Sequence, residues 1–192
     1  MKYFISDPHF FHAASIEHCN RPFASVEEMN ETIVENINRT VPRNCELFFL
    51  GDVSFGTRED TYKLLRKING SKTLILGNHD KIIKKSDQIK SEIFGNRVFE
   101  QRVIKIDCPE LANHLHLNHY AMLSWYSSHY GSGHLHGHHH GSLRDKPNGS
   151  RMLDVGVDCN NFTPFTEAEV IHLLTSIPFQ KRQRRTNDDD AN

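Results

Sequence analysis

Several features that mark other classes of protein are scarce in these 192 residues. The four cysteines are scattered and never stand in a C-x-x-C pair: Cys19, Cys45, Cys108 and Cys159. This spacing does not suit a secreted disulfide framework, so we expect reduced thiols. Lys and Arg number 23 against 24 Asp and Glu. The chain therefore lacks the basic surplus that holds phosphate backbones by charge, and nucleic acid is not indicated as a partner.

Long apolar runs are also missing, and the first predicted strand begins almost at Met1, without the charged and apolar regions of a signal peptide. We therefore expect a cytoplasmic protein without a membrane partner. Neither an internal repeat nor a domain linker is visible, and the length suits one core, which predicts a single domain over residues 1–180. Residues 181–192 carry clustered charges of both signs and predict a disordered tail. Nothing in the sequence indicates the oligomeric state.

Histidine, by contrast, is abundant: the chain has 14, and those between 134 and 140 are internal and interrupted, unlike a tag. Many of them follow short apolar stretches that read as strands. Tyr3–Ile5 runs into Asp7 and His9, Leu47–Leu50 into Asp52, Leu74–Leu76 into Asn78, His79 and Asp80, Leu115–Leu117 into His119, and the stretch ending at His136 into His138 and His140. Because ligand sites of open α/β sheets lie outside the carboxyl ends of the strands, we expect these side chains to converge on a metal site.

Capping boxes mark the start of two helices, at Ser25–Glu28 and at Thr166–Glu169. After the first box, Met29, Ile33 and Ile37 recur every four residues and predict one apolar face packed on a sheet. The second box predicts a last helix that ends near residue 174.

Between two predicted strands, Glu59–Asn69 predicts another helix with Gly70 at its left-handed C-terminal cap. This strand, helix, strand unit favours parallel strands joined by a right-handed crossover. Farther along, Lys81–Lys90 reads as a solvated helix or loop, while Val98–Phe99 and Val103–Ile106 alternate as an antiparallel strand or pair would. The order of elements fits two sheets with flanking helices.

Taken together and in this order, the motifs D-x-H, G-D, G-N-H-D, H and G-H-x-H resemble the calcineurin-like metallophosphoesterase superfamily, over Asp7 to His140. Additional motifs resemble a small branch of it found in phages and bacteria: Arg21-Pro22-Phe23, Glu28-Met29-Asn30, His119-Tyr120, Ser124-Trp125 and the segment from Asp154 to Asp158. The resemblance implies an α/β fold, a four-layer αββα sandwich in which two mixed β-sheets are flanked by helices, over residues 1–180.

The resemblance also implies a dinuclear metal centre and assigns its ligands by motif position. Asp7, His9 and His140 would hold one metal, Asn78, His119 and His138 the other, and Asp52 would bridge both. By motif position, His79 resembles the general acid beside the leaving oxygen, and we expect Asp80 to orient it.

The implied activity is metal-dependent hydrolysis of a phosphoester by a bridging hydroxide. The substrate would be small, either a nucleotide-type phosphodiester or a phosphomonoester, and the sequence leaves this choice open. A ligand set of imidazole, carboxylate and amide oxygen without thiolate suits two divalent ions, with manganese first and iron, nickel or zinc as alternatives. Arg21 and Arg58 are candidates for binding the substrate phosphate.

Departures from the superfamily pattern narrow the range of possible substrates. Val53-Ser54-Phe55 follows Asp52 and Asp80 follows His79, unlike the motifs of serine/threonine protein phosphatases. The chain also lacks room for the capping domain of the larger nucleases. Two other classes stay open as alternatives. One is a non-catalytic, histidine-rich metal-binding protein, which would not need His79, and the other is a protein that binds or cleaves nucleic acid.

The motif G-H-x-H occurs twice, at Gly133–His136 and at Gly137–His140. We assign the ligands to His138 and His140, because the superfamily places this pair just after a strand. Choosing His134 and His136 instead would leave the strand too short. His116 and His136, just before ligands, are then candidates for contacting the ligands from behind.

Overall fold

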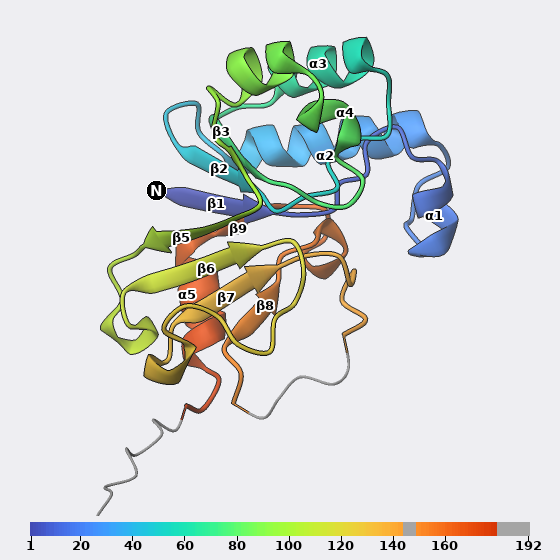
Figure 1. The fold of residues 1–192 in the computed structure, drawn as a ribbon. Helices are drawn as coiled ribbons and strands as arrows, with labels where there is room; N and C mark the ends of the chain where they lie inside the picture. The colour runs from blue at the N-terminus through green and yellow to red at the C-terminus, as the bar shows by residue number, and fades with distance from the viewer. Residues whose placement is uncertain (144–148, 180–192) are drawn as a thin grey trace, which may run out of the picture.

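The computed structural model describes residues 1–143 and 149–179, so the disordered tail predicted at 181–192 lies outside the described residues. Two β-sheets form its centre (Figure 1). The first sheet has the strand order β4-β3-β2-β1-β9. Its strands are β1 (Lys2–Ile5), β2 (Glu46–Phe49), β3 (Ser71–Ile75), β4 (Val98–Phe99) and β9 (Phe165–Thr166). Only β9 runs antiparallel to its neighbour.

The second sheet has the order β5-β6-β7-β8. Its strands are β5 (Gln101–Lys105), β6 (His114–Asn118), β7 (Gly133–His136) and β8 (Met152–Asp154). Strand β5 pairs antiparallel with β6, whereas β6, β7 and β8 are parallel. Both sheets are therefore mixed, as predicted.

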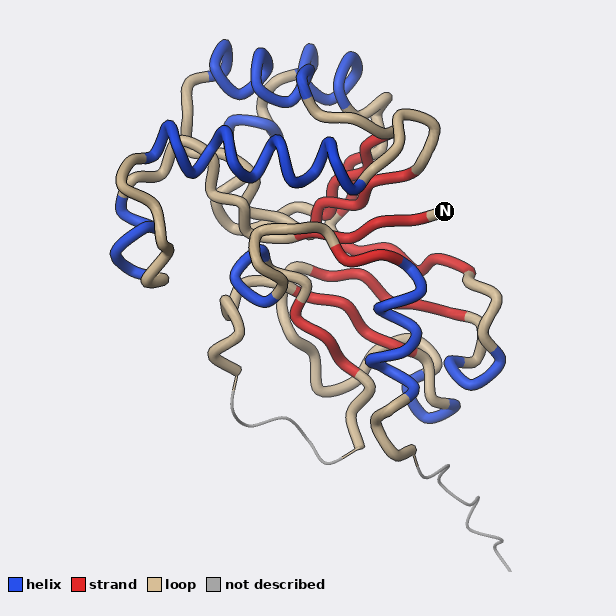
Figure 2. The backbone as a smooth tube through the Cα atoms, turned by 180° about the vertical axis from the view of Figure 1, so that it is seen from behind, coloured by secondary structure: helices blue, strands red, loops and turns tan. Residues whose placement is uncertain are grey.

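The described residues contain these α-helices: α1 (Ala14–His18), α2 (Val26–Thr40), α3 (Arg58–Lys67), α4 (Lys81–Lys84) and α5 (Glu167–Thr175). Shorter turns of helix are η1 (Ile89–Ile93), η2 (Pro109–Leu111), η3 (Ser128–Tyr130) and η4 (Val157–Cys159). Helices α2 and α3 lie together on one side of the first sheet (Figure 1). Seen from behind, α5 lies across the strands of the second sheet (Figure 2). None of the helices in this part of the chain is long and apolar enough to cross a membrane.

Helix α2 begins where its capping residues predict. The Ser25 hydroxyl accepts a hydrogen bond from the Glu28 amide at 3.2 Å, which satisfies one of the free N–H groups of the first turn. The predicted stripe of Met29, Ile33 and Ile37 is fully buried against the first sheet. Helix α5 starts with a complete capping box, in which Thr166 and Glu169 bond each other's backbone N–H. The box at Thr166–Glu169 is therefore confirmed, whereas at Ser25–Glu28 only the Ser25 half forms, because the Glu28 carboxylate accepts from the N–H of Ala24 at 2.7 Å.

Helix α3 and the strand after it form the predicted crossover unit. The helix is shorter than expected, beginning at Arg58 after the Thr57 cap and ending at Lys67. Gly70 adopts the left-handed conformation, with φ +84°, in the turn that leads into β3. Strands β2 and β3 are parallel, as predicted.

Two apolar clusters hold the layers together. One lies between α2, α3 and the first sheet, and the other lies between the two sheets and includes Val170 and Leu174 of α5. The inner side chains alternate along the strands, so that Tyr3 and Ile5 face the helices while Phe4 faces the second sheet. The predicted class, an α/β sandwich of two mixed sheets flanked by helices, is therefore confirmed.

The expectation of an antiparallel strand or pair at residues 98–106 holds for β5, which is antiparallel to β6, and is wrong for Val98–Phe99. Val98–Phe99 forms β4 at the edge of the first sheet, parallel to β3, whereas Gln101–Lys105 forms β5 of the second sheet. The chain crosses between the sheets at Glu100, so these two segments do not pair with each other. The lysine-rich stretch at residues 81–90 contains α4 and the start of η1, in line with the predicted helix or loop.

Strands β1, β6 and β7 run in the same direction, and their carboxyl ends lie on the side of the molecule where α1 stands (Figure 1). Parallel pairing places the carboxyl ends of β2 and β3 on this side too. Every segment that carries a predicted ligand therefore leaves its sheet at the same edge.

Candidate metal centre

The predicted ligands come together at this edge in two groups. In each group the candidate ligand atoms lie within 4.8 Å of one another. One group is Asp7, His9 and His140, and the other is Asp52, His119 and His138. Asn78 joins the second group, because its Oδ1 lies 3.0 Å from His119 Nε2. The structure thus brings together all seven residues that the motifs single out as ligands.

Asp52 stands between the two groups. Its Oδ2 lies 3.8 Å from His9 Nε2 and 3.6 Å from His119 Nε2. Its other oxygen, Oδ1, accepts a hydrogen bond from the backbone N–H of His79 at 2.8 Å. One carboxylate oxygen therefore faces both groups, which is the position that a bridging ligand requires.

Two buried atoms of the first group have no hydrogen-bond partner in the described structure: Asp7 Oδ1 and His9 Nε2, which lie 3.9 Å apart. Buried polar atoms of native proteins are almost always satisfied, so this pair calls for a missing partner. Ligands at about 2.0–2.2 Å from one cation are separated from each other by roughly 3 to 4 Å. A divalent ion between these two atoms fits the donor types and their spacing.

Backbone contacts select the nitrogen with which His119 faces the centre. Its Nδ1 lies 2.7 Å from the Leu50 carbonyl oxygen, to which it donates a hydrogen bond. With the proton on Nδ1, the lone pair of Nε2 points toward Asp52 and Asn78. His119 is therefore held in the tautomer that can bind a metal.

His140 is held by a partly buried ion pair with Asp158. Its Nδ1 donates a hydrogen bond to Asp158 at 2.7 Å. Arg21 donates two further hydrogen bonds to the same carboxylate, at 2.8 Å each. Burial acts to lower the pKa of His140, but the hydrogen bond to Asp158 and the carboxylates of Asp7 and Asp158 outweigh it, so this pKa is raised. The proton on Nδ1 leaves Nε2 for the group that contains Asp7 and His9.

Arg21 itself is not available to a substrate. Its side chain has no exposed surface, and besides Asp158 it donates to the backbone oxygens of Asp7 at 2.8 Å and Pro8 at 3.0 Å. The expectation that Arg21 binds phosphate is therefore wrong, because its donors hold the loop after β1 instead. Arg58 is exposed and lines a small pocket with Lys81 and Lys85, so its role stays a prediction.

Five of the seven candidate ligands adopt the left-handed backbone conformation, which non-glycine residues seldom visit. They are Asp7 (φ 55°), His9 (53°), Asp52 (52°), His138 (69°) and His140 (48°). Each such residue costs about 1–3 kcal/mol, and clusters of them are typical of functional sites. The strain is concentrated in the turns that follow β1, β2 and β7, which aim these side chains at one point.

Two glycines allow these turns to approach one another. A Cβ atom on Gly77 would overlap Asp52, and one on Gly137 would overlap Ser6 and Asp7. Because the backbone at Gly137 comes this close, the N–H of His138 can donate to Asp7 Oδ2 at 2.9 Å. The glycines that precede Asn78 and His138 are therefore required by close packing.

His79 lies beside the second group without belonging to it. Its side chain is 48% exposed, and its Nε2 lies 4.0 Å from Asp52 Oδ2. The ring packs against Phe55, with centroids 4.8 Å apart. A half-exposed imidazole at the rim of the centre can reach a bound molecule, and its role as general acid stays a prediction.

Asp80 does not orient the His79 ring, so that part of the prediction is wrong. Its buried carboxylate accepts hydrogen bonds from the N–H groups of Val53 at 2.8 Å, Gly77 at 2.8 Å and Asp52 at 3.0 Å. Burial raises the pKa of Asp80, against the opposing effect of these N–H groups. Asp80 joins the turns after β2 and β3 and thereby positions Asp52.

Electrostatics in the first group also suit a cation. Burial raises the pKa of the Asp7 carboxyl to about 7, although the nearby imidazoles of His119 and His140 act to lower it. Burial, together with the charges of His140 and Arg21, lowers the pKa of His9 to about 3, so the imidazole is neutral, as a metal ligand must be. A bound cation would offset the cost of burying the Asp7 carboxylate in its charged form.

The histidines of the other G-H-x-H motif, His134 and His136, lie outside both ligand groups. His134 and His136 are fully buried within β7. The His134 nitrogens lie 3.0 Å from the His116 carbonyl oxygen and 3.1 Å from that of Tyr120, and Trp125 stacks on its ring. His116 is paired with His134 across β6 and β7, so these histidines share one face of the second sheet. They belong to a packed layer under the loop after β6.

Sequence reasoning missed two residues behind the ligands. His12 Nδ1 lies 3.0 Å from His9 Nδ1, and Asp158 holds His140 as described above. Asp158 could have been noticed in the sequence, since it ends a motif of the smaller branch. Its partner Arg21, however, is 137 residues away along the chain. His12 had only its spacing, three residues after His9.

No family model matches this chain. The chain is 32% identical over 179 residues to the uncharacterized protein MJ1445 of Methanocaldococcus jannaschii, a match that covers 90% of both chains, and it belongs to the same family as this archaeal protein. Among solved structures, a protein of unknown function from Aquifex aeolicus, AQ665, is similar in fold, with a TM-score of 0.66 at 20% identity. The match covers 90% of this chain and 98% of that one.

Proposed function

We propose that this protein is a metal-dependent phosphoester hydrolase of the calcineurin-like metallophosphoesterase type, with two divalent ions as cofactors. The observation that carries the proposal is the position of Asp52, whose single oxygen Oδ2 faces His9 of one ligand group and His119 of the other. A carboxylate shared in this way is useful only to a centre that holds two ions.

The types and grouping of the candidate ligand atoms support the same proposal. Asp7, His9 and His140 would hold one ion, and Asn78, His119 and His138 the other, with Asp52 between them. When bound, a pair of divalent ions polarises the phosphoryl oxygens and lowers the pKa of a bound water. Oxygen and imidazole ligands without thiolate suit manganese, iron, nickel or zinc, and we place manganese first.

The chain's own residues supply the rest of the chemistry. His79 is half-exposed at the rim, with its backbone fixed by Asp52, so it can donate a proton to the leaving oxygen of an ester held at the centre. The Asp80 carboxylate keeps Asp52 in place by accepting a hydrogen bond from the backbone N–H of Asp52. His140 and His119 are each held in one tautomer by Asp158 and Leu50.

The substrate in this proposal is a small phosphate ester, a nucleotide-type diester or a monoester. We also propose that the protein works in the cytoplasm, which is supported by four cysteines that are all free.

The test is hydrolysis by protein that has been stripped with a chelator and reloaded with one metal at a time. The substrates are p-nitrophenyl phosphate, bis(p-nitrophenyl) phosphate, a cyclic nucleotide, and single-stranded DNA as a check on the nuclease alternative. We expect turnover of a mono- or diester only after reloading, and a large loss in Asp52→Asn, which keeps the shape of the bridge but not its charge.

Two results would contradict the proposal. One is turnover by protein that elemental analysis shows to be free of metal. The other is a protein that takes up two ions but hydrolyses none of these esters, which would favour a metal-binding protein without catalysis. Preference for single-stranded DNA over the small esters would favour a nuclease.

A further inference from the structure

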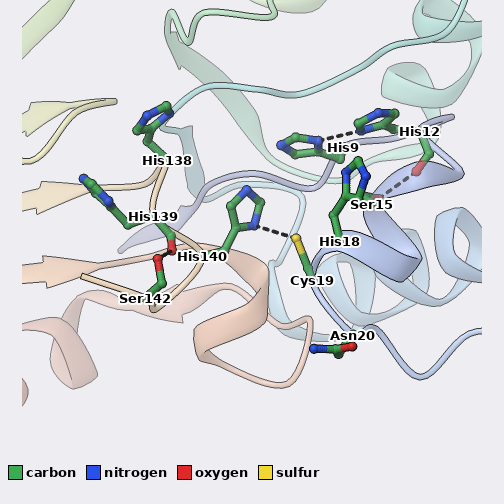
Figure 3. Close-up of a pocket in the computed structure, with 10 residues that line it drawn as sticks. All are labelled: His9, His12, Ser15, His18, Cys19, Asn20, His138, His139, His140 and Ser142. Atoms are coloured by element: carbon green, nitrogen blue, oxygen red, sulfur yellow. Dashed lines mark hydrogen bonds between the residues drawn. The ribbon is translucent and has the colours of Figure 1, made fainter. Parts of the chain in front are cut away.

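A pocket of about 500 Å³ opens next to the metal centre. Helix α1 and the residues after it form one wall, and the turn after β7 forms the other (Figure 3). Its lining residues are His9, His12, Ser15, His18, Cys19, Asn20, His138, His139, His140 and Ser142. His9, His138 and His140 belong to the ligand groups. A phosphate held at the centre therefore has this pocket beside it.

The lining of the pocket has an unusual composition: six imidazoles, two serine hydroxyls, an amide and a thiol, with no carboxylate and no aliphatic side chain. The carboxylates of the candidate ligands Asp7 and Asp52 are buried and do not line it. The hydroxyls of Ser15 and Ser142 donate to backbone oxygens, and three of the imidazoles belong to the ligand groups. The donors left for an occupant come from His12, His18, His139 and Asn20, and no carboxylate lines the pocket. Such a lining suits an anionic oxygen group and does not suit an apolar one.

His12 is fixed in this wall with a defined donor. If His9 binds a metal through Nε2, its Nδ1 carries the proton and donates to His12 Nδ1, 3.0 Å away. The remaining proton of His12 is then on Nε2. The ring is held in place by Phe55, on which it stacks with centroids 3.9 Å apart and planes 8° apart. His12 therefore presents an N–H group on a ring that cannot easily turn.

His18 completes the wall from the last turn of α1. Its ring lies 6.5 Å from that of His12, and Figure 3 shows it between His9 and Cys19, across the pocket from His140. The side chain is exposed and makes no hydrogen bond to any residue in the described part of the chain. The fold does not use this imidazole, so it is free to bind a ligand.

We propose that this pocket binds a second anionic group of the substrate, a phosphate or a carboxylate carried on the part of the molecule that is bonded to the ester phosphate. The inference rests on the proposed function, because it requires the ester phosphate to be held at the metal centre. It narrows the substrate class to phosphate esters that bear another acidic group.

The test measures the binding of three phosphonates to the metal-loaded full-length protein by calorimetry. Ethylphosphonate has a neutral tail, while 2-carboxyethylphosphonate and ethane-1,2-diphosphonate carry an anion at the same reach. We expect the two charged compounds to bind at least about tenfold tighter than ethylphosphonate, since a hydrogen bond to a charged group is worth this much.

The His18→Ala variant should lose most of that advantage and keep the affinity for ethylphosphonate, and His18→Gln, which keeps an N–H donor, should recover part of it. The matched control is His172→Ala, an exposed histidine on α5 that does not line the pocket. It should bind all three compounds as the unaltered protein does. Circular dichroism and metal content confirm that each variant is folded and loaded.

The outcomes separate the two proposals. Equal binding of the three phosphonates overturns the second anion site and leaves the proposed function standing. A charged advantage that His18→Ala does not reduce also overturns it, because the extra affinity then comes from the metals alone. If ethylphosphonate itself does not bind to metal-loaded protein, the proposed function fails and the second site fails with it.

Discussion

Two neighbouring histidine pairs, four residues apart, have opposite surroundings. His134 and His136 lie inside β7, fully buried, with their backbone in the sheet. His138 and His140 lie in the turn directly after it, with φ values of 69° and 48°, and each stands in a ligand group. The side chains are chemically identical, and only their position relative to the end of the strand differs.

The comparison teaches that the backbone decides what a histidine does here. Inside the strand, the nitrogens of His134 face backbone carbonyls, which leaves nothing for a ligand. After the strand, the close approach of Gly137 to Asp7 bends the chain so that the next imidazoles point at the centre. The predictions below test this contrast.

The largest effect is expected from removing a ligand. His138→Ala and His140→Ala should each lower bound metal and reduce activity by more than the 10–100-fold typical of a residue behind a ligand. His134→Ala and His136→Ala should keep their metal, because both side chains are buried within β7 and belong to neither ligand group. Elemental analysis and ester hydrolysis measure both quantities. Full metal content in His140→Ala together with loss in His134→Ala would reverse the assignment of the two pairs.

His79 sharpens the contrast, because it lies at the centre without being placed as a ligand. His79→Ala should keep its metal and lose roughly 10²–10⁴-fold in rate, the scale of general acid catalysis. The loss should be smaller for esters of nitrophenol, which need little protonation to leave. Equal losses for good and poor leaving groups, or loss of metal, would argue against the acid role.

A smaller effect is expected from the residue that holds His140. Asp158→Asn removes the carboxylate that accepts the Nδ1 proton and should weaken metal binding about 10–100-fold. Asp158→Glu keeps an acceptor and should lose less. The matched control is Asp107→Asn, an exposed aspartate that should leave metal binding unchanged. Calorimetric titration with manganese measures the affinity, and unchanged binding in Asp158→Asn would show that His140 needs no partner.

The last prediction concerns the contribution of buried His134 to folding stability, which leaves the metal centre untouched. Burial lowers the pKa of His134 to about 4, whereas the unfolded chain has a value near 6.5. The unfolded state then takes up a proton first, so His134 stabilises the fold above pH 6.5 and this contribution falls by roughly 3 kcal/mol as the pH drops toward 4. Urea unfolding of the unaltered protein and of His134→Gln should show the difference between them narrowing over this range. A constant difference would mean that His134 is not buried in its neutral form.

Much of this arrangement is predictable from local sequence. The capping residues Ser25 and Thr166 and the apolar stripe of α2 depend on neighbours within one or two helical turns, so their outcome follows from the sequence alone. The gathering of the candidate ligands was predictable because each follows a strand, and parallel strands end at one edge.

The contacts behind the ligands were not predictable in this way. Asp80 follows His79 in the sequence, yet its carboxylate accepts hydrogen bonds from the N–H groups of Asp52 and Val53 in the turn after β2. These groups come close to Asp80 only when β2 and β3 are paired. Arg21 finds Asp158 only after the whole sandwich has closed. Likewise, Val98–Phe99 and the following strand separate into two sheets because the chain crosses between the layers, which alternation along the sequence cannot reveal.

The most direct test of the two-ion centre is a crystal structure of the manganese-loaded protein with an anomalous difference map. The account predicts two anomalous peaks, one among Asp7, His9 and His140 and one among Asn78, His119 and His138, with Asp52 touching both ions. A single peak that does not involve Asp52, or an ion held by His134 and His136, would contradict it.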